Sequence, residues 1–236
     1  MLKIQKNKKQ FVDCFNIIKS LVIEIDLNFN KEEIFIRAVH PSNHCMAIVK
    51  IKKALFEEYN VETERVYTVS MDNLIKILNN LSEKELEIIP ENDILIFKDH
   101  KRKYKLNYFV GSKDTRPIPQ FEHKVKVNMS SQEFFNLVSE TFVFDQIGNF
   151  EISEGKLFVN SKSHLVSCNV QAIIKNIQGQ DGKVFFDFTY IDMVKGIKNL
   201  FEDVELSLDS EFPLSIKCKN DNIDFEFILA NRVENE

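Results

Sequence analysis

The sequence predicts an α+β fold, with two similar domains of antiparallel sheet that each carry a few short helices. Three observations support this prediction. Most of the chain alternates apolar and polar residues with a period of two, which is typical of strands that bury one face. Four short segments carry apolar residues at helical spacing instead. The two halves of the chain also repeat each other in the order of these segments.

The alternating segments are spread over the whole chain. Residues 34–38 place Ile34, Ile36 and Ala38 on one face, and residues 45–51 alternate in the same way. Because no helix falls regularly between hydrophobic strands, α+β is favoured over α/β. Further alternating segments begin at Tyr104, Val125, Val166, Val184 (continuing to Tyr190), Val204, Leu214 and Ile223.

The four helical segments are short and amphipathic, and strands flank each of them. The third segment begins after Ser130, and Ser130 and Glu133 have the spacing of a capping box. The four segments cover about 8–25, 71–81, 131–142 and 191–201.

Two shifts describe the internal repeat. Residues 71–88 resemble residues 191–208 at a shift of 120. Residues 34–36 resemble residues 157–159 at a shift of 123. A repeat of this length indicates two copies of one helix-and-strand module rather than a solenoid.

A segment without periodicity separates the two copies. Residues 109–122 contain a glycine, two prolines and several charges, a composition that is typical of a connector. We therefore predict a first domain over residues 1–108 and a second domain over residues 123–236, joined by this connector.

Composition excludes several classes of protein. Of the 236 residues, 44% are hydrophobic and 28% are charged, which fits a globular chain with a substantial core. No apolar run is long enough to span a membrane, and no secretion signal is recognisable, so we expect an intracellular protein. Without a CxxC pair, the cysteines are expected to be reduced, buried thiols rather than disulfides or zinc ligands. They are Cys14, Cys45, Cys168 and Cys218.

The sequence offers no support for catalysis. It has only 6 glycines and lacks the glycine-rich motifs that cradle phosphates, so no nucleotide cofactor is expected. No nucleophile elbow or recognisable triad order occurs. His40, His44 and Cys45 lie close together, but a tetrahedral zinc site needs a fourth donor, so we expect no metal. We predict that the protein is not an enzyme and that it has no catalytic residues and no cofactor.

Several long segments resemble one known family. Residues 36–78 are similar, without gaps, to the first domain of the archaeal and eukaryotic DNA sliding clamp, proliferating cell nuclear antigen. Residues 117–138, 146–152 and 188–233 resemble later parts of the same family. The resemblance implies that three subunits close into a ring whose helices line the hole. It also implies a polymerase processivity factor that encircles duplex DNA, docks replication and repair enzymes, and is opened by a separate ATP-driven loader.

The resemblance gives the lysines a role. Lysines on a surface helix usually form a solvated face, but in a ring these helices would face double-stranded DNA and contact its backbone without reading bases. The net charge of −5 does not exclude this, because local clustering decides polyanion binding. The implied DNA-binding residues are Lys8, Lys9, Lys19, Lys76, Lys195 and Lys198.

The resemblance also implies an apolar cleft for a short partner motif of one glutamine, one aliphatic and two aromatic residues. Through it, DNA polymerase, clamp loader, nuclease and ligase would bind. We expect Ile228→Asp to abolish this binding and to leave assembly intact. The implied residues are Val39, His44, Met46, Ile118, Pro119, Pro213, Ile228, Ala230 and Asn231.

Subunits are expected to join strand to strand. Tyr104–Val110 and Val166–Ile174 are the expected exposed edges, because a neighbour's edge can satisfy their backbone groups. The sequence leaves homotrimer and heterotrimer open. The implied interface residues are Tyr104, Leu106, Tyr108, Cys168, Val170 and Ala172.

Two alternatives remain at this point. The family often bears arginines on its third helix and has a proline after its last strand, whereas this chain has Asn136 and Ser139 on that helix and Asn231 after the strand. These departures favour one subunit of a heterotrimeric or checkpoint-type clamp. A protein-only interaction scaffold without DNA contact is the other alternative. A clamp would lie in the cytoplasm or nucleoid of an archaeon, or in the nucleus of a eukaryote.

Overall fold

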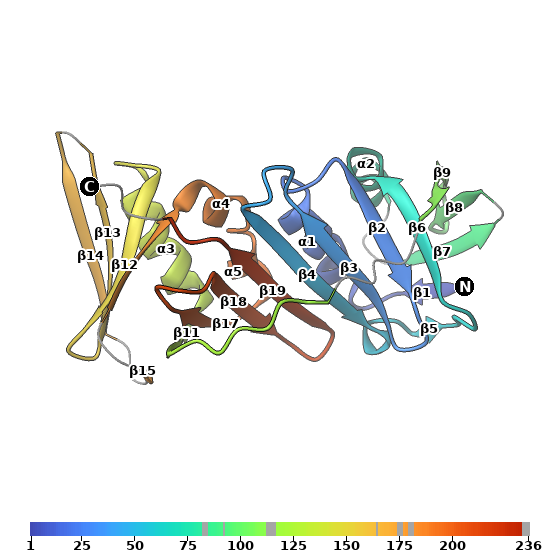
Figure 1. The fold of residues 1–236 in the computed structure, drawn as a ribbon. Coiled ribbons are helices and arrows are strands. Elements are labelled where there is room, and N and C mark those ends of the chain that lie inside the picture. Colours follow the sequence, from blue (N-terminus) through green and yellow to red (C-terminus); the bar gives the residue numbers. More distant parts are fainter. Residues whose placement is uncertain are drawn as a thin grey trace. The chain divides into compact units, whose positions relative to one another are not determined.

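The fold consists of two compact units that exchange short segments. In this computed structural model, the described residues are 1–81, 85–91, 93–111, 117–163, 165–173, 177–178 and 182–232. The first unit comprises Met1–Pro41, Ala47–Pro117 and Lys219–Phe225. The second unit comprises Ser42–Met46, Ile118–Cys218 and Glu226–Glu236. Each unit is described on its own below (Figure 1).

The first unit contains a five-stranded sheet in the order β5-β1-β7-β8-β9 and a second run of strands in the order β10-β6-β2-β3-β4. All neighbouring pairs of the five-stranded sheet are antiparallel. Its elements are β1 (Leu2–Ile4), α1 (Lys8–Ile18), β2 (Glu24–Phe29), β3 (Glu33–Val39), β4 (Cys45–Lys52), a 3-10 turn (Lys53–Leu55), β5 (Glu58–Tyr59), β6 (Arg65–Ser70), α2 (Met71–Asn80), β7 (Leu86–Glu91), β8 (Ile94–Lys98), β9 (Lys103–Asn107) and β10 (Phe109–Val110).

The second unit contains a four-stranded antiparallel sheet in the order β14-β13-β12-β16 and a run of strands in the order β19-β18-β17-β11-β15. Its elements are β11 (Val125–Ser130), α3 (Ser131–Phe142), β12 (Ile147–Ser153), β13 (Lys156–Lys162), β14 (Ser167–Ile173), β15 (Ile177–Gln178), β16 (Gly182–Asp187), α4 (Phe188–Met193), α5 (Ile197–Leu200), β17 (Asp203–Leu208), β18 (Leu214–Lys219) and β19 (Ile223–Leu229).

Aromatic side chains fill both cores. In the first unit, the Phe11 ring packs edge-on against Phe15 and Phe56, with ring centroids 5.0 and 6.0 Å away. In the second unit, Phe150 is surrounded by other phenylalanine rings, and α3 contacts strands of both sheets. Aromatic pairs in these geometries add to the stabilisation from burial alone. The period-two pattern of the sequence is confirmed, because β3 buries every second side chain over its whole length.

The internal repeat is confirmed, and both expected shifts appear in the structure. α1 and α3 begin 123 positions apart, as do β2 and β12, and β3 and β13. The shift of 120 holds from the end of the helix onward: the Leu81 N–H donates to the carbonyl of Ile77 as the Phe201 N–H does to that of Ile197, and Leu2 pairs with Ile88 as Val125 pairs with Leu208. The start of α2 and the start of α4 are only 117 positions apart, so the second copy has three more residues where its helix is divided into α4 and α5.

Three expected boundaries differ from the structure. The first helix ends at Ile18 rather than near residue 25. The expected strand through Tyr190 ends at Asp187, whose carboxylate accepts the Thr189 N–H (3.0 Å) and starts α4 as an N-cap. The expected helix over 191–201 is therefore two short helices, with Gly196 at the start of α5.

The expected capping box does not form. Ser130 is the N-cap residue of α3, but its side chain makes no capping hydrogen bond. Ser131 anchors this end of the helix instead. Its N–H donates to the carbonyl of Glu202 (2.8 Å), and its hydroxyl donates to the carbonyl of Phe201.

The cysteines are free thiols, as expected, although one of them is only half-buried. Burial raises the pKa of the Cys14, Cys45 and Cys218 thiols to about 12. Such thiols stay protonated and unreactive near neutral pH. Cys168, on β14, is the half-buried one.

Gly148 tests the packing of the second unit. A Cβ placed there would lie 2.1 Å from the Phe188 ring, so Gly148→Ala forces that buried ring to move. We expect the free energy of unfolding to fall by about 1–3 kcal/mol, measured by chemical denaturation. Gly182→Ala is the matched control, since among the described residues nothing lies within 4 Å of its Cβ. Equal effects of the two substitutions would contradict this packing.

Candidate functional site

The lysines of the first unit divide into exposed and buried ones. Lys9, Lys19 and Lys76 are exposed on or beside α1 and α2. Lys8 is not, because it is only 3% exposed and its Nζ donates to the carbonyl of Leu81 (2.9 Å). The prediction that Lys8 contacts DNA is therefore wrong. A buried ammonium needs such a partner, and this bond ties α1 to the end of α2.

The second unit presents fewer lysines on its helices. Lys195 is exposed between α4 and α5, and Lys198 on α5 is half-buried. α3 carries no basic residue, and its exposed side chains include Glu133 and Glu140. In α1, the helix in the same place in the repeat, the exposed Lys9 stands where α3 exposes Gln132.

Aspartates accompany three of these exposed lysines. Lys76 lies 2.8 Å from Asp72, and Lys195 lies 3.1 Å from Asp192. Lys9 lies 3.9 Å from Asp13. Exposed pairs of this kind are worth about 0.3–0.5 kcal/mol, so a phosphate can compete for the lysine. The pairs lower the net positive charge of each helix and keep its attraction to a polyanion weak.

A second candidate site lies around the last strand of the second unit. The Ala230 N–H donates to the carbonyl of His44 (2.8 Å), which joins two residues of the predicted partner cleft. His44 Nδ1 lies 3.2 Å from the Tyr190 hydroxyl, and Ser42 Oγ lies 3.1 Å from the same hydroxyl. Sequence reasoning missed Tyr190, because it falls at the end of an alternating pattern that predicts a strand.

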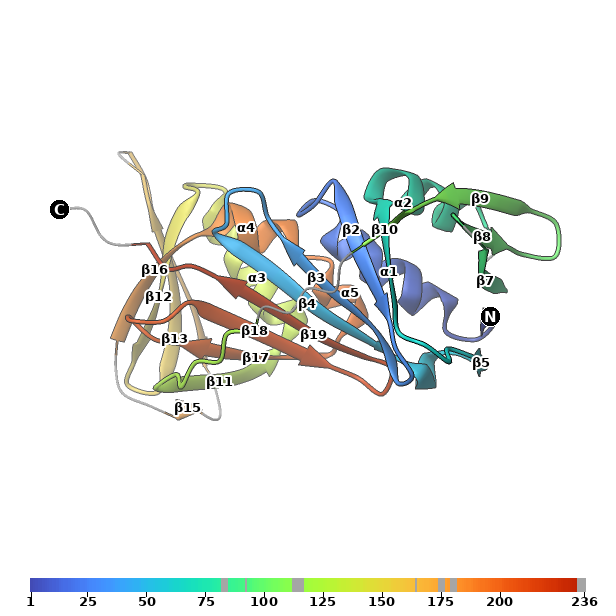
Figure 2. The same ribbon diagram turned by 45° about the vertical axis from the view of Figure 1, so that its right-hand side comes forward.

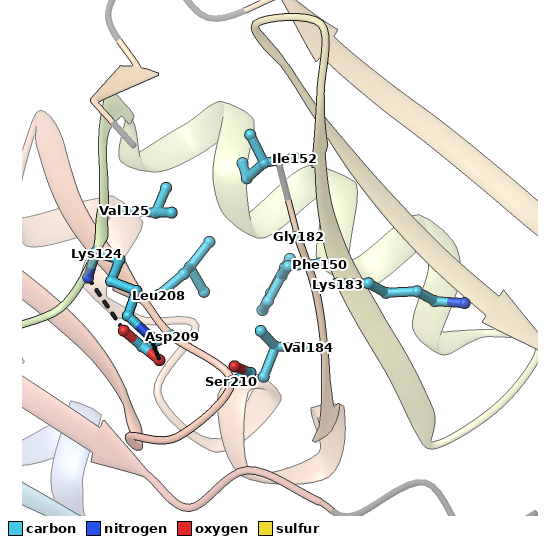
Figure 3. Close-up of a pocket in the computed structure, with 10 residues that line it drawn as sticks. All are labelled: Lys124, Val125, Phe150, Ile152, Gly182, Lys183, Val184, Leu208, Asp209 and Ser210. Carbon is cyan, nitrogen blue, oxygen red and sulfur yellow. Dashed lines mark hydrogen bonds and ion pairs between the residues drawn. The ribbon is translucent and has the colours of Figure 1, made fainter. Parts of the chain in front are cut away.

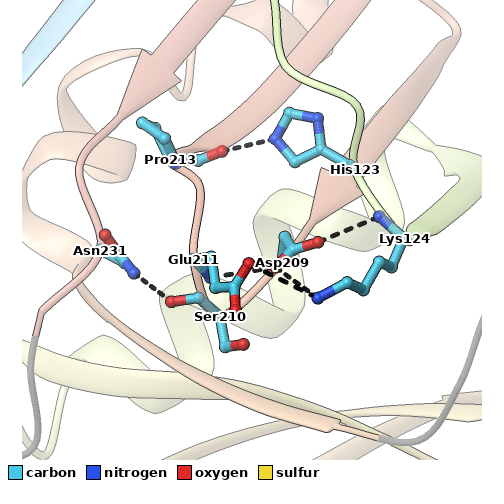
Figure 4. Close-up of polar contacts among 7 residues, drawn as sticks. All are labelled: His123, Lys124, Asp209, Ser210, Glu211, Pro213 and Asn231. Atoms are coloured by element: carbon cyan, nitrogen blue, oxygen red, sulfur yellow. Dashed lines mark hydrogen bonds and ion pairs between the residues drawn. The ribbon is translucent and has the colours of Figure 1, made fainter.

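The turn between β17 and β18 connects the two sides of this region (Figure 4). On one side, His123 Nε2 donates to the carbonyl of Pro213 (2.6 Å), at the exit of the connector. On the other side, Asn231 Nδ2 donates to the carbonyl of Ser210 (2.7 Å). The Phe212 ring also packs against Phe121, with centroids 5.6 Å apart. The turn therefore holds both the connector and the segment after the last strand.

Asp209 stabilises this turn from inside. Its side chain is 0% exposed, and its carboxylate accepts the N–H groups of Glu211 (2.9 Å) and Lys124 (3.2 Å). Desolvation alone would raise the pKa of Asp209, but these hydrogen bonds and the charges of Lys124 and His123 outweigh it and lower the pKa. The sequence of residues 209–213, Asp-Ser-Glu-Phe-Pro, is typical of an exposed turn. It therefore gave no indication that the carboxylate of Asp209 is buried.

A small cavity of about 190 Å³ lies beside the same turn (Figure 3). Buried apolar side chains, among them Phe150, Ile152 and Leu208, line it, while Lys124 and Asp209 lie at its polar side. The cavity thus borders the turn that holds the connector.

The structure corrects the expectation for Ile228. This side chain is only 4% exposed, so it belongs to the core and not to an open cleft. Ile228→Asp would bury an unpaired carboxylate and disturb folding, which makes it unsuitable as a probe of partner binding. The other expected cleft residues are accessible: His44 is exposed, and Val39, Met46, Ile118, Pro119, Pro213, Ala230 and Asn231 are half-buried.

The second expected interface strand lies at a sheet edge, whereas the first, expected over Tyr104–Val110, is divided into β9 and β10, and β10 pairs with β6 in a different sheet. β9 is the last strand of the five-stranded sheet (Figure 2), and β14 is the last strand of the four-stranded sheet. Tyr108 and Ala172 point into their own units and are buried, so their side chains are not available to a neighbour. Tyr104, Cys168 and Val170 are half-buried, and Leu106 is buried but lines a surface hollow. Ile174 lies outside the described residues.

Comparison with known proteins identifies the family of this chain. A family model described as proliferating cell nuclear antigen, N-terminal domain, matches residues 2–132, which is more than half of the chain. The chain belongs to the proliferating cell nuclear antigen family. Its likeness to a curated member, "DNA polymerase sliding clamp 3" of Sulfurisphaera tokodaii, is 23% identity over 95% of this chain and 96% of that one.

Solved structures of proliferating cell nuclear antigens share the fold over the whole chain. A. fulgidus PCNA, bound to the C-terminal region of FEN-1, superposes with a TM-score of 0.90 at 24% identity and covers 100% of both chains. A chain of the PCNA2–PCNA3 complex from Sulfolobus tokodaii gives a TM-score of 0.88 at 20% identity and covers 99% of both chains. In the described part of this family member, no helix is long and apolar enough to cross a membrane. The same residues contain no group of three or more His, Cys, Asp or Glu that could hold a metal ion.

Asp209 gives a pH-dependent test of the turn. Because its pKa is lower in the folded than in the unfolded chain, its ionised form stabilises the fold above about pH 4, and this contribution disappears as pH falls further. We expect Asp209→Asn to lower the thermal unfolding midpoint at pH 7, with a smaller difference from the unsubstituted chain at pH 3. The exposed Asp221→Asn serves as control. A difference that is constant with pH would exclude this role for the carboxylate.

Proposed function

We propose that the protein is a subunit of a DNA sliding clamp, a polymerase processivity factor that encircles duplex DNA and docks replication and repair enzymes. One observation carries the proposal: a duplicated family fold in which β9 ends a sheet of the first unit and β14 ends a sheet of the second unit. Head-to-tail pairing of two different edges builds a ring when the rotation closes. The PCNA2–PCNA3 complex from Sulfolobus tokodaii supports pairing between subunits of this fold.

The clamp acts on DNA by holding it loosely. The exposed lysines of α1, α2 and the α4–α5 region supply phosphate contacts, and the accompanying aspartates weaken each contact. Contacts to phosphates alone carry no sequence information, so they leave the protein free to slide. The protein performs no chemistry on DNA in this proposal, and its place is wherever the replicating DNA lies in the cell.

Partner enzymes dock at the region of His44, Met46 and Ala230. The C-terminal region of FEN-1 bound to A. fulgidus PCNA supports docking of a nuclease on this fold. The turn that Asp209 stabilises holds the connector near Pro213 and the terminal segment near Ser210, so it fixes two borders of this region. A preorganised surface lowers the entropic cost of binding a peptide.

The DNA contact is tested by substituting its lysines. We expect Lys76→Ala and Lys195→Ala to shorten retention of the loaded clamp on circular DNA. The dependence of log affinity on log salt should become shallower by about one for each phosphate contact removed. Lys8→Met is the control: it should lower stability and leave the salt dependence unchanged, because Lys8 is buried. Unchanged retention in both exposed variants would favour the scaffold without DNA contact.

The partner region is tested with a peptide that carries glutamine, an aliphatic and two aromatic residues. Met46 is half-buried two positions from His44 on the same face of the chain, so Met46→Glu places a charge where the apolar part of the peptide would bind. We expect the dissociation constant of the peptide to rise at least about tenfold in calorimetry, while the molar mass of the assembled protein stays unchanged. Thr63→Glu, at an exposed loop position of the first unit, should have no effect. Equal peptide affinity in both variants would place the partner site elsewhere.

A further inference from the structure

His44 is exposed, yet hydrogen bonds hold it from three sides. Its carbonyl accepts the Ala230 N–H (2.8 Å), and its own N–H donates to Ser42 Oγ (3.4 Å). Its ring nitrogen Nδ1 lies 3.2 Å from the Tyr190 hydroxyl. Fixing an exposed side chain costs conformational entropy, which water alone does not require. An imidazole that is already fixed at the surface is suited to bind another molecule, because less freedom is then lost on binding.

A turn of the chain lets Ser42 and His44 reach the same tyrosine. Asn43, which lies between them, has a φ of 59°, in the left-handed region that asparagine tolerates better than most residues. Ser42 Oγ lies 3.1 Å from the Tyr190 hydroxyl, on which His44 Nδ1 also converges. The turn therefore presents two polar groups to one phenol.

Tyr190 meets this turn from α4, which is anchored in the core. Phe188 and Ile191 of the same helix are fully buried, and the Phe188 ring packs against Phe150 with ring centroids 5.3 Å apart. The half-buried Tyr190 ring lies edge-on to the His44 ring, with centroids 5.9 Å apart. α4 cannot rotate without exposing its core side chains, so the phenol stays within reach of the imidazole.

The chemistry of the three groups favours one direction for these hydrogen bonds. A neutral imidazole nitrogen is a stronger acceptor than a hydroxyl oxygen, and a phenol is a stronger donor than an alcohol. The favoured order therefore runs from the Ser42 hydroxyl to the Tyr190 oxygen, and from the Tyr190 hydroxyl to His44 Nδ1. When Nδ1 accepts in this way, the proton of the neutral ring is on Nε2.

His44 Nε2 is on the side of the ring that faces away from Tyr190. No residue in the described part of the chain forms a hydrogen bond with it. Met46, two positions along the chain, and Ala230, bonded to the His44 carbonyl, belong to the region where partner enzymes are proposed to dock. A fixed N–H donor beside apolar side chains is a recognition group for an oxygen acceptor.

We propose that Tyr190 is a positioning residue for partner binding: it holds the His44 ring so that Nε2–H donates to an oxygen atom of the docked partner segment. The proposal rests on the docking function proposed above and adds a determinant of specificity to it. A partner that presents an apolar group or an N–H donor at this point leaves Nε2–H unpaired and binds more weakly.

The first test is a double-mutant cycle, measured by calorimetry with the peptide that carries glutamine, an aliphatic and two aromatic residues. Tyr190→Phe keeps the ring and removes only the hydroxyl. We expect the dissociation constant of the peptide to rise about three- to tenfold, because the imidazole loses its fixed orientation. In a His44→Ala chain, Tyr190→Phe should have no further effect, since no ring remains to be positioned. Equal effects of Tyr190→Phe in both chains overturn the proposal.

The second test observes the imidazole directly. In chains with ¹⁵N-labelled histidine, nitrogen chemical shifts in alkaline buffer report which ring nitrogen carries the proton. The His44 signals are identified by their loss in His44→Ala. We expect the proton on Nε2 in the unsubstituted chain and a larger share of the Nδ1–H form in Tyr190→Phe. A proton on Nδ1 in the unsubstituted chain, or no change in Tyr190→Phe, overturns the proposal.

The control removes a tyrosine hydroxyl elsewhere. The Tyr59 hydroxyl donates to the carbonyl of Asn30 in the first unit (2.8 Å), so Tyr59→Phe should change neither the His44 signals nor the affinity for the peptide. Equal binding of the peptide to the unsubstituted chain and to Tyr190→Phe contradicts only the role of Tyr190. A peptide that binds neither chain contradicts the docking function, and this proposal with it.

Discussion

An open strand edge must find hydrogen-bond partners, and this requirement organises the molecule. β9 and β14 each end a sheet, and each leaves a row of backbone groups on its outer side. A hollow lined by residues of α2, β9 and β10 lies at the first edge, and the exposed apolar side chains of Val143, Phe144 and Ile147 follow α3 in the second unit. α2, beside β9, presents Lys76, whereas α3, which contacts β14, carries no basic residue.

Duplication has given the two units the same elements and different charges. α1 and α3 occupy the same place in the repeat, yet α1 exposes Lys9 and α3 exposes the carboxylates of Glu133 and Glu140. The same contrast appears inside the units. In the first unit, Lys8 is buried and donates to the carbonyl of Leu81. In the second unit, Ser131 stands at the position that matches Lys8 and donates to the carbonyl of Phe201. The first residue of the helix thus anchors its start in both units, through an ammonium group in one and a hydroxyl group in the other.

Sequence periodicity predicted most of the strands, the places of the helices and the repeat itself, because these depend on local patterns. Lys8 was misjudged although a signal existed: it precedes Phe11 by three residues and so lies on the buried stripe of its own helix. Ile228 was misjudged because alternation in β19 ends before Leu229, where consecutive side chains are buried. Asp209 could not be predicted, since its burial depends on Lys124, which is 85 residues away in the chain.

The exchange of segments between the units ties folding to the order of synthesis. The first unit includes Lys219–Phe225, where the carbonyl of Asn222 accepts the Lys52 N–H and Asp224 forms an ion pair with Lys52. Contacts this distant in sequence form slowly, because a long loop must close first. When the ribosome has released the residues up to Pro117, the first unit therefore still lacks Lys219–Phe225. The amino-terminal unit reaches its final structure only after nearly the whole chain has been made.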